Sequence, residues 1–147
     1  MFDFEKPNIE ILEISEDKRF GRFVCEPLER GYGATLGNSL RRMMLSSLPG
    51  AAVSAIKIQG LSGDTISGVK ESYSEVLTNL KSLVVSLPDG VEQLEAHLEV
   101  SEKEEAKASD FKAESEFVLI NPDLHIATLE KGAELSIGIV ITRGQGY

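Results

Sequence analysis

The strongest constraint on the fold is an apolar residue at every second position in two stretches near the middle and end of the chain. In residues 134–142 these apolar residues are Leu135, Ile137, Ile139 and Ile141. In residues 94–100 they are Leu94, Ala96, Leu98 and Val100. Successive side chains of a strand point to opposite faces of its sheet, so both stretches are predicted to be half-buried strands.

Shorter apolar stretches predict further strands. Residues 9–14 and 22–26 are separated by a polar segment, which predicts two strands joined by a tight turn. Pro27 removes a backbone donor and ends this ladder. Residues 52–59 and 124–129 are also predicted to be strands.

Two polar stretches are predicted to be loops. Residues 61–68 read LSGDTISG and are rich in Gly and Ser. Residues 101–110 read SEKEEAKASD and carry many charges without an apolar stripe. A solvated loop is the simpler interpretation of the second stretch, and an acidic docking site for a partner is the alternative.

Two stretches have helical periodicity instead. The first has one apolar face, made of Leu36, Leu40, Met43, Met44, Ser47 and Leu48. Thr35 is its predicted N-cap, and Pro49 with Gly50 ends it. A second helix is predicted within residues 70–84, shorter than its pattern suggests. Strands that outnumber two separate helices predict an α+β fold with antiparallel sheets.

Composition excludes several classes of function. The net charge is −9, so a broad surface that neutralises phosphates is not expected, and we predict no direct nucleic-acid binding. One cysteine, Cys25, and two histidines cannot build a zinc site, and a single cysteine fits a reducing compartment. Neither a signal peptide nor a stretch of ~18 apolar residues is present, which predicts a soluble, cytoplasmic protein without membrane contact.

The glycines of residues 31–37 raise one alternative, a small anion- or nucleotide-binding protein, because backbone donors at a helix N-terminus can hold a phosphate. Gly31, Gly33 and Gly37 do not match the known templates, however. A dinucleotide fingerprint would have glycine at Leu36, and a P-loop would have lysine at Asn38.

No catalytic constellation is evident. The 24 acidic residues are scattered, and no serine lies in a G-x-S-x-G elbow. His97 and His125 are expected to be surface or core-edge residues. We therefore predict no catalytic residue, no metal and no cofactor. The arginines Arg30, Arg41 and Arg42 are either solvated helix residues or interface residues, since guanidinium groups bind carboxylates in bidentate fashion.

A resemblance decides between these interpretations. The segment LERGYGATLGNSLRRMMLSSLPG, residues 28–50, is similar almost residue for residue to the N-terminal domain of bacterial RNA polymerase alpha subunits. Flanking segments occur in the family's order: FEKPNIE at 4–10, NPDLHIATL at 121–129 and RGQGY at 143–147. The resemblance thus covers nearly the whole chain.

The resemblance implies a dimerisation and assembly part, residues 1–51 with 143–147, and an inserted β-rich lobe, residues 52–142. It implies a non-catalytic subunit that forms a homodimer and a platform for the beta and beta-prime subunits. The implied dimer interface consists of Leu36, Leu40, Met43, Met44, Ser47 and Leu48. Arg42 matches the arginine tied to beta-subunit binding, and the neighbouring motif residues are Glu29, Arg30, Asn38, Ser39 and Arg41.

The chain departs from the family in two places. The family's His-Glu-Phe or His-Glu-Tyr after the Ile-x-Gly turn is replaced within residues 61–72, where a beta-subunit contact is expected. Family members also continue beyond the equivalent of Tyr147 with a strand pair and a long helix, so the apolar face of residues 36–48 is expected to lack its usual cover. A dimer layer completed by another chain is therefore the alternative to a homodimer. A truncated alpha-like decoy that sequesters polymerase subunits is the alternative function.

Overall fold

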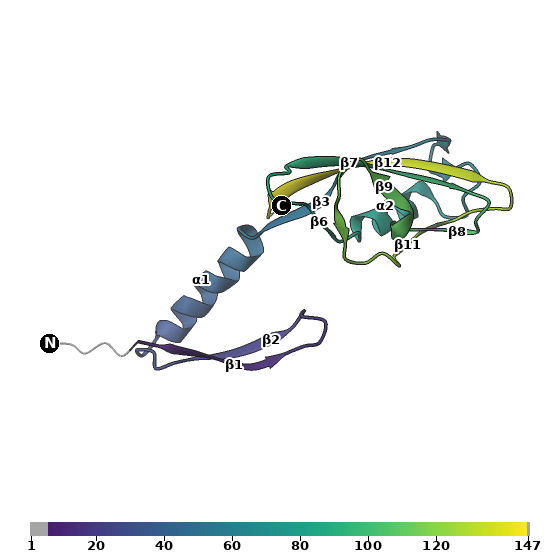
Figure 1. The fold of residues 1–147 in the computed structure, drawn as a ribbon. Coiled ribbons are helices and arrows are strands. Elements are labelled where there is room, and N and C mark those ends of the chain that lie inside the picture. The colour runs from purple at the N-terminus through teal and green to yellow at the C-terminus, as the bar shows by residue number, and fades with distance from the viewer. Residues whose placement is uncertain (1–5, 147) are drawn as a thin grey trace. The chain divides into compact units, whose positions relative to one another are not determined.

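The computed structural model describes residues 6–146 and divides the chain into two compact units, Met1–Ser47 and Leu48–Tyr147 (Figure 1). Two helices accompany sheets whose strands pair antiparallel throughout the described residues. The predicted α+β class is therefore confirmed.

The first unit consists of a β-hairpin followed by a helix. Strands β1 (Asn8–Ile14) and β2 (Gly21–Glu26) pair antiparallel, and helix α1 (Tyr32–Ser46) comes next. The turn between the strands is closed by Ser15, whose hydroxyl accepts hydrogen bonds of 3.1 and 3.0 Å from two backbone N–H groups of the turn. The predicted strand pair and the predicted helix are both confirmed.

The predicted N-cap of the helix, Thr35, is wrong. Helix α1 is preceded by Gly31, which serves as N-cap with a left-handed φ of 87° and without a side-chain cap. Glycine adopts this conformation without a steric penalty, so the chain enters the helix about one turn earlier than the hydroxyl suggested. The carbonyl of Thr35 instead accepts a hydrogen bond of 2.8 Å from the Ser39 hydroxyl inside the helix.

The second unit is built on a six-stranded sheet with the order β10-β6-β3-β12-β7-β9. In chain order its strands are β3 (Pro49–Ile58), β6 (Val85–Ser86), β7 (Gln93–Ser101), β9 (Phe111–Ala113), β10 (Val118–Leu119) and β12 (Glu134–Gln145). Helix α2 (Tyr73–Lys81) lies against one face of this sheet (Figure 1). The unit therefore has two layers around one core.

Strand β12 occupies the centre of the sheet and pairs with both β3 and β7. Ile139, for example, lies opposite Ile56 on one side and Ala96 on the other. The alternation predicted for both long strands is confirmed, because the buried residues are Leu135, Ile137, Ile139 and Ile141 on β12 and Leu94, Ala96, Leu98 and Val100 on β7.

Helix α2 begins with a capping box. The Ser72 hydroxyl accepts from the Glu75 backbone N–H, and the Glu75 carboxylate accepts from the Ser72 backbone N–H at 2.8 Å. These bonds satisfy N–H groups that a helix start otherwise leaves unpaired. Val76 and Leu80 lie fully inside the core. The helix is shorter than its periodic pattern, as predicted.

Residues 101–110 are not the solvated loop that the sequence predicted. Strand β8 (Glu105–Lys107) and a 3-10 turn (Ala108–Asp110) follow β7, and β8 pairs with β11 (His125–Thr128). Ala106 and Ala108 are completely buried. Two alanines are too small to produce an apolar stripe, so only the long-range pairing reveals this ribbon.

The predicted loop at residues 61–68 is also partly wrong. It contains a short hairpin of β4 (Leu61–Ser62) and β5 (Thr65–Ile66). The Asp64 carboxylate in its turn accepts hydrogen bonds from the Ser74 backbone N–H and hydroxyl, at 3.1 and 3.0 Å. The hairpin is thereby tied to the first turn of α2.

The last residues of β12 pair with β3 and are also held by hydrogen bonds of the Arg143 side chain. The Arg143 guanidinium donates to three carbonyl groups of the connection between β6 and β7, those of Leu87, Pro88 and Val91, at 3.3, 2.9 and 3.2 Å. The functional division into an assembly part (1–51 with 143–147) and an inserted lobe (52–142) stays a prediction.

We predict that Ile137→Ala strongly destabilises the second unit. Ile137 is completely buried on the central strand, and truncating a buried isoleucine costs about 2–5 kcal/mol. Urea unfolding followed by circular dichroism measures the loss. Ile120→Ala is the matched control, since Ile120 is 62% exposed and its truncation should change stability by less than about 0.5 kcal/mol. Equal losses in the two variants would contradict the assignment of the core.

Candidate interaction surface

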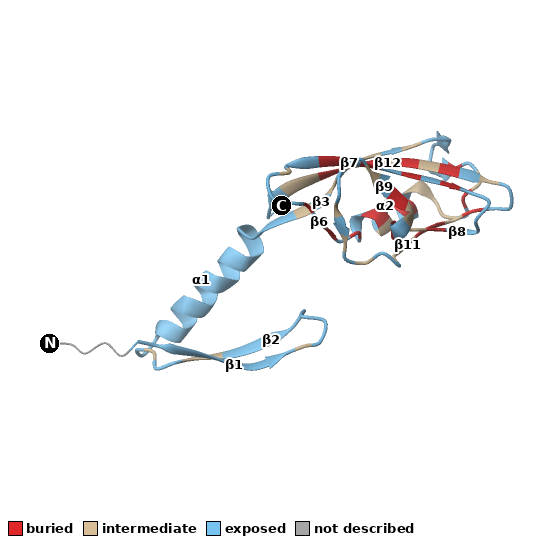
Figure 2. Cartoon of the chain, in the orientation of Figure 1, coloured by how far each residue is buried: buried red, intermediate tan, exposed pale blue. Residues whose placement is uncertain are grey.

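Helix α1 carries an apolar stripe that the described residues of the first unit leave largely exposed. None of its residues is buried (Figure 2). The predicted interface residues are exposed by 36% at Leu36, 50% at Leu40, 59% at Met43, 64% at Met44 and 59% at Leu48. Soluble proteins rarely leave a continuous apolar face in water unless it binds something. The stripe is therefore a candidate interaction surface.

The structure places the six predicted interface residues in two groups. Leu36, Leu40, Met43 and Met44 lie within α1, on one side of it by helical periodicity. Ser47 is the C-cap, and its backbone N–H donates to the Met43 carbonyl at 2.9 Å. Leu48 begins the second unit.

A second face of α1 carries the predicted arginine site. At about 100° per residue, Asn38 and Arg42 lie on the side of the helix away from the stripe, and Arg41 lies between that side and the stripe. Within residues 6–146 none of the arginines Arg30, Arg41 and Arg42 forms an ion pair. Their guanidinium groups are thus available to an acidic partner.

Leu45 belongs to this arginine face, and the sequence analysis missed it. The side chain is 60% exposed and lies on the same side of the helix as Asn38 and Arg42. An apolar side chain among polar interface residues is typical of an anchor. Its isolated position off the stripe is the signal that would have revealed it.

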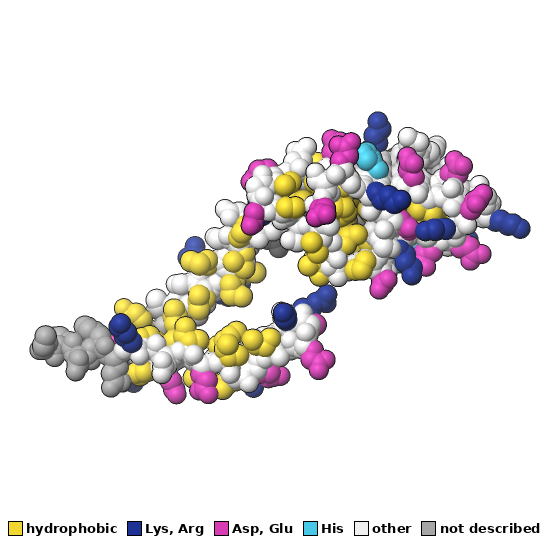
Figure 3. Space-filling view, in the orientation of Figure 1, with side chains coloured by type: hydrophobic (Ala, Val, Ile, Leu, Met, Phe, Trp, Pro, Cys, Tyr) yellow, Lys and Arg dark blue, Asp and Glu magenta, His cyan; other side chains and the backbone are white. Residues whose placement is uncertain are grey.

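The hairpin of the first unit adds a further exposed apolar area. Ile9, Ile11 and Phe23 are 73%, 60% and 57% exposed, and Ile11 lies directly opposite Phe23 in the ladder. Apolar side chains gather along the hairpin and along α1 in the space-filling view (Figure 3). A strand pattern predicts which residues share a face but not whether that face is covered, which is why the sequence analysis did not identify this area.

The glycine segment does not form the loop that phosphate binding requires. Gly31 precedes α1, but Gly33 and Gly37 lie inside the helix. Their backbone N–H groups are consequently not gathered into a cradle ahead of the first turn. Apart from the flanking residues and the backbone of the helix itself, no described atom lies within 4 Å of the position that a Cβ would occupy at Gly33 or Gly37. This geometry favours an interaction surface over an anion site.

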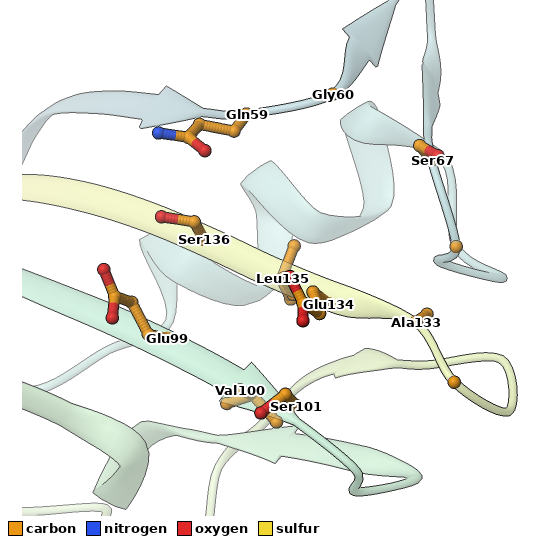
Figure 4. A pocket seen from close by; sticks show the side chains of 12 residues that line it. Gln59, Gly60, Ser67, Glu99, Val100, Ser101, Ala133, Glu134, Leu135 and Ser136 are labelled. Atoms are coloured by element: carbon orange, nitrogen blue, oxygen red, sulfur yellow. The ribbon is translucent and has the colours of Figure 1, made fainter.

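A hollow in the second unit lies between the β3–β4 turn and the ends of β7 and β12 (Figure 4). Its lining includes the carboxylates Glu99 and Glu134 and the hydroxyls of Ser67, Ser101 and Ser136, but no Lys, Arg or His among the described residues. Two carboxylates without a cation repel a phosphate group, so the hollow does not suit a nucleotide.

The described residues also meet neither the requirements of a metal site nor those of a membrane-spanning helix. Within residues 6–146 no group of three or more His, Cys, Asp or Glu side chains is arranged to hold a metal ion. Among the described helices, none has the length and apolar content needed to cross a membrane.

Comparison with known proteins identifies the family. Residues 61–147 match the family described as the RNA polymerase Rpb3/RpoA insert domain. The chain is 48% identical over 149 residues to the DNA-directed RNA polymerase subunit alpha of Alkaliphilus metalliredigens and to that of Syntrophomonas wolfei. It is 47% identical to the corresponding subunit of Staphylococcus aureus.

These alignments include 100% of this chain and 47% of each relative. The chain thus spans about half the length of the curated relatives it matches. The segment 61–72, which departs from the expected family motif, lies inside the matched insert domain. Because the family match includes more than half of its residues, the chain belongs to the family of bacterial RNA polymerase alpha subunits.

Proposed function

We propose that this chain is a non-catalytic assembly scaffold of a bacterial RNA polymerase, which self-associates through α1 and captures the beta subunit. The observation that carries the proposal is that α1, a 15-residue helix in a member of this family, has no buried residue. A helix of this length is marginally stable in water by itself, so its apolar stripe gains most from a partner.

The stripe suits a second copy of the chain. Leucine and methionine side chains at helical spacing interdigitate well with the same surface across a two-fold axis, and such isologous contacts are the commonest in homo-oligomers. Methionine also adapts its shape to the facing side chains. The exposed hairpin residues would extend the same contact.

The arginine face suits the beta subunit. Arg42 and Asn38 are four residues apart on one side of α1, and Leu45 adds an apolar anchor beside them. Because this face points away from the stripe, one helix can contact a second copy and another subunit at the same time. We assign Glu29, Arg30 and Arg41 supporting roles at this contact, and the beta-prime subunit would then join the assembled platform.

The scaffold would act in the cytoplasm, and its net charge of −9 favours protein partners over direct contact with nucleic acid. Catalysis would be carried out by the other subunits of the polymerase.

We predict that Leu40→Asp abolishes self-association, because it places a charge in the centre of the stripe. Light scattering at several concentrations should give masses approaching twice 16.0 kDa for the wild type and close to 16.0 kDa for the variant. Leu45→Asp is the matched control in the same helix, on the other face, and should behave like the wild type. A wild type that is monomeric at all concentrations, or equal effects of the two substitutions, would refute the stripe as the dimer interface.

We predict that Arg42→Ala weakens capture of a purified bacterial beta subunit by tenfold or more, since truncating a hydrogen-bonded charge at an interface costs about 2–5 kcal/mol. Arg19→Ala, in the exposed hairpin turn, controls for the loss of one positive charge. Surface plasmon resonance measures the capture, and thermal unfolding of both variants should match the wild type. Unchanged capture by Arg42→Ala would remove this residue from the beta-subunit contact.

A further inference from the structure

His125 is held between two carboxylates that come from different parts of the second unit. Its Nδ1 lies 2.8 Å from Oε1 of Glu105 on β8, and its Nε2 lies 2.8 Å from Oε1 of Glu71 in the loop before α2. His125 itself is the first residue of β11. The imidazole therefore links three segments that are distant in the sequence.

The two carboxylates differ in their other partners. Glu71 also accepts hydrogen bonds from the Thr128 backbone N–H at 2.7 Å and the Thr128 hydroxyl at 2.6 Å, and its side chain is 18% exposed. Glu105 has no further side-chain hydrogen bond among the described residues, and its side chain is 43% exposed. Glu71 is thus fixed by its surroundings, whereas Glu105 can readily be hydrated.

The charges around this cluster favour a protonated imidazole. Partial burial by itself would raise the pKa of Glu71, but hydrogen bonds from Thr128 and His125 outweigh it and lower that pKa to about 2. Hydrogen bonds to Glu71 and Glu105 raise the pKa of His125 above its ordinary value, against the effect of desolvation.

Three other charged residues belong to the elements packed here. Lys107 lies opposite His125 in the β8–β11 register, Glu75 on α2 lies beside Glu71, and Lys70 precedes Glu71. The carboxylates that directly contact the ring are nevertheless Glu71 and Glu105.

The arrangement is not that of a metal site. The two carboxylates approach opposite nitrogens of one ring, so no single point lies within ligand distance of all three side chains. Both ring nitrogens can donate a hydrogen bond only when the imidazole carries its second proton. Once that proton leaves, one nitrogen presents a lone pair to a carboxylate, and that contact becomes repulsive.

We propose that Glu71, His125 and Glu105 form a proton-dependent clasp between the loop before α2 and the β8–β11 ribbon. With His125 protonated, both carboxylates are held. When the proton is lost, the neutral ring keeps Nε2–H donating to the well-anchored Glu71 and releases the exposed Glu105, so the β8 side of the clasp opens. This inference concerns the second unit and does not depend on the scaffold proposal.

The sign of the pH dependence follows from the two groups. The pKa of His125 is raised in the folded protein, so its stabilising contribution is complete below its ordinary value of 6.5 and is lost as the pH rises through the raised pKa. The pKa of Glu71 is lowered, so its contribution is present above the ordinary value of 4.5 and is lost as the pH falls toward about 2. The clasp is therefore tightest in mildly acidic solution and opens on the alkaline side.

Nitrogen NMR of the full chain tests the proposal, because the sequence contains only two histidines and His97→Gln assigns the remaining signal to His125. We expect both His125 nitrogens to be protonated at low pH and the Nε2–H tautomer to dominate at high pH. Glu105→Gln should lower the His125 midpoint by about 0.5 pH unit or more. Glu95→Gln, at an exposed position of strand β7, is the matched control and should leave the midpoint unchanged.

A dominant Nδ1–H tautomer, or the same midpoint in Glu105→Gln and Glu95→Gln, would overturn the proposal. Hydrogen exchange provides a second readout that does not depend on the substitutions. The Leu129 backbone N–H donates to the Glu104 carbonyl at 2.8 Å, next to the clasp. Its protection factor should fall severalfold as the pH passes through the His125 midpoint, whereas that of Ile137 on β12 should stay constant. Equal behaviour of the two amides would also refute the opening of the β8 side.

Discussion

Strand β12 pairs with β3 along one side and with β7 along the other. Its buried side chains, Leu135, Ile137, Ile139 and Ile141, belong to the hydrophobic core of the second unit. The remaining elements of the second unit are organised around this three-stranded centre. Helix α2 covers it with Val76 and Leu80, and the short strands extend its edges. A central strand with two partners satisfies its backbone groups on both sides, which fixes the register of its neighbours.

The first unit lacks such a centre. The described residues of its hairpin and helix are exposed or at most half-buried, and no strand pairs with the hairpin from outside. Folding energy in proteins comes mainly from apolar burial, and this unit leaves its apolar side chains in water. The self-association proposed for this unit would therefore also stabilise it. The second unit, in contrast, contains its own core.

The ribbon of β8 and β11 has both buried apolar residues and exposed polar ones. Its buried alanines attach it to the core, whereas Glu105 and His125 lie at its partly exposed edge. Polar groups at such an edge contribute little to overall stability because water competes for them. They can still decide whether the edge is closed, since the local opening of a ribbon takes far less free energy than global unfolding.

Local sequence patterns were sufficient to predict the long strands and both helices, and the motif of residues 28–50 was sufficient to predict the family. Alternation over residues 94–100 and 134–142 and the helical spacing from Leu36 are local periodicities, which a chain displays whatever its tertiary contacts. The tertiary structure decided the start of α1 at Gly31, the ribbon at Ala106 and the clasp around His125. Each of these depends on a backbone conformation or on contacts between residues far apart in the chain, such as Glu71 and His125, which are 54 positions apart. No local pattern predicts them.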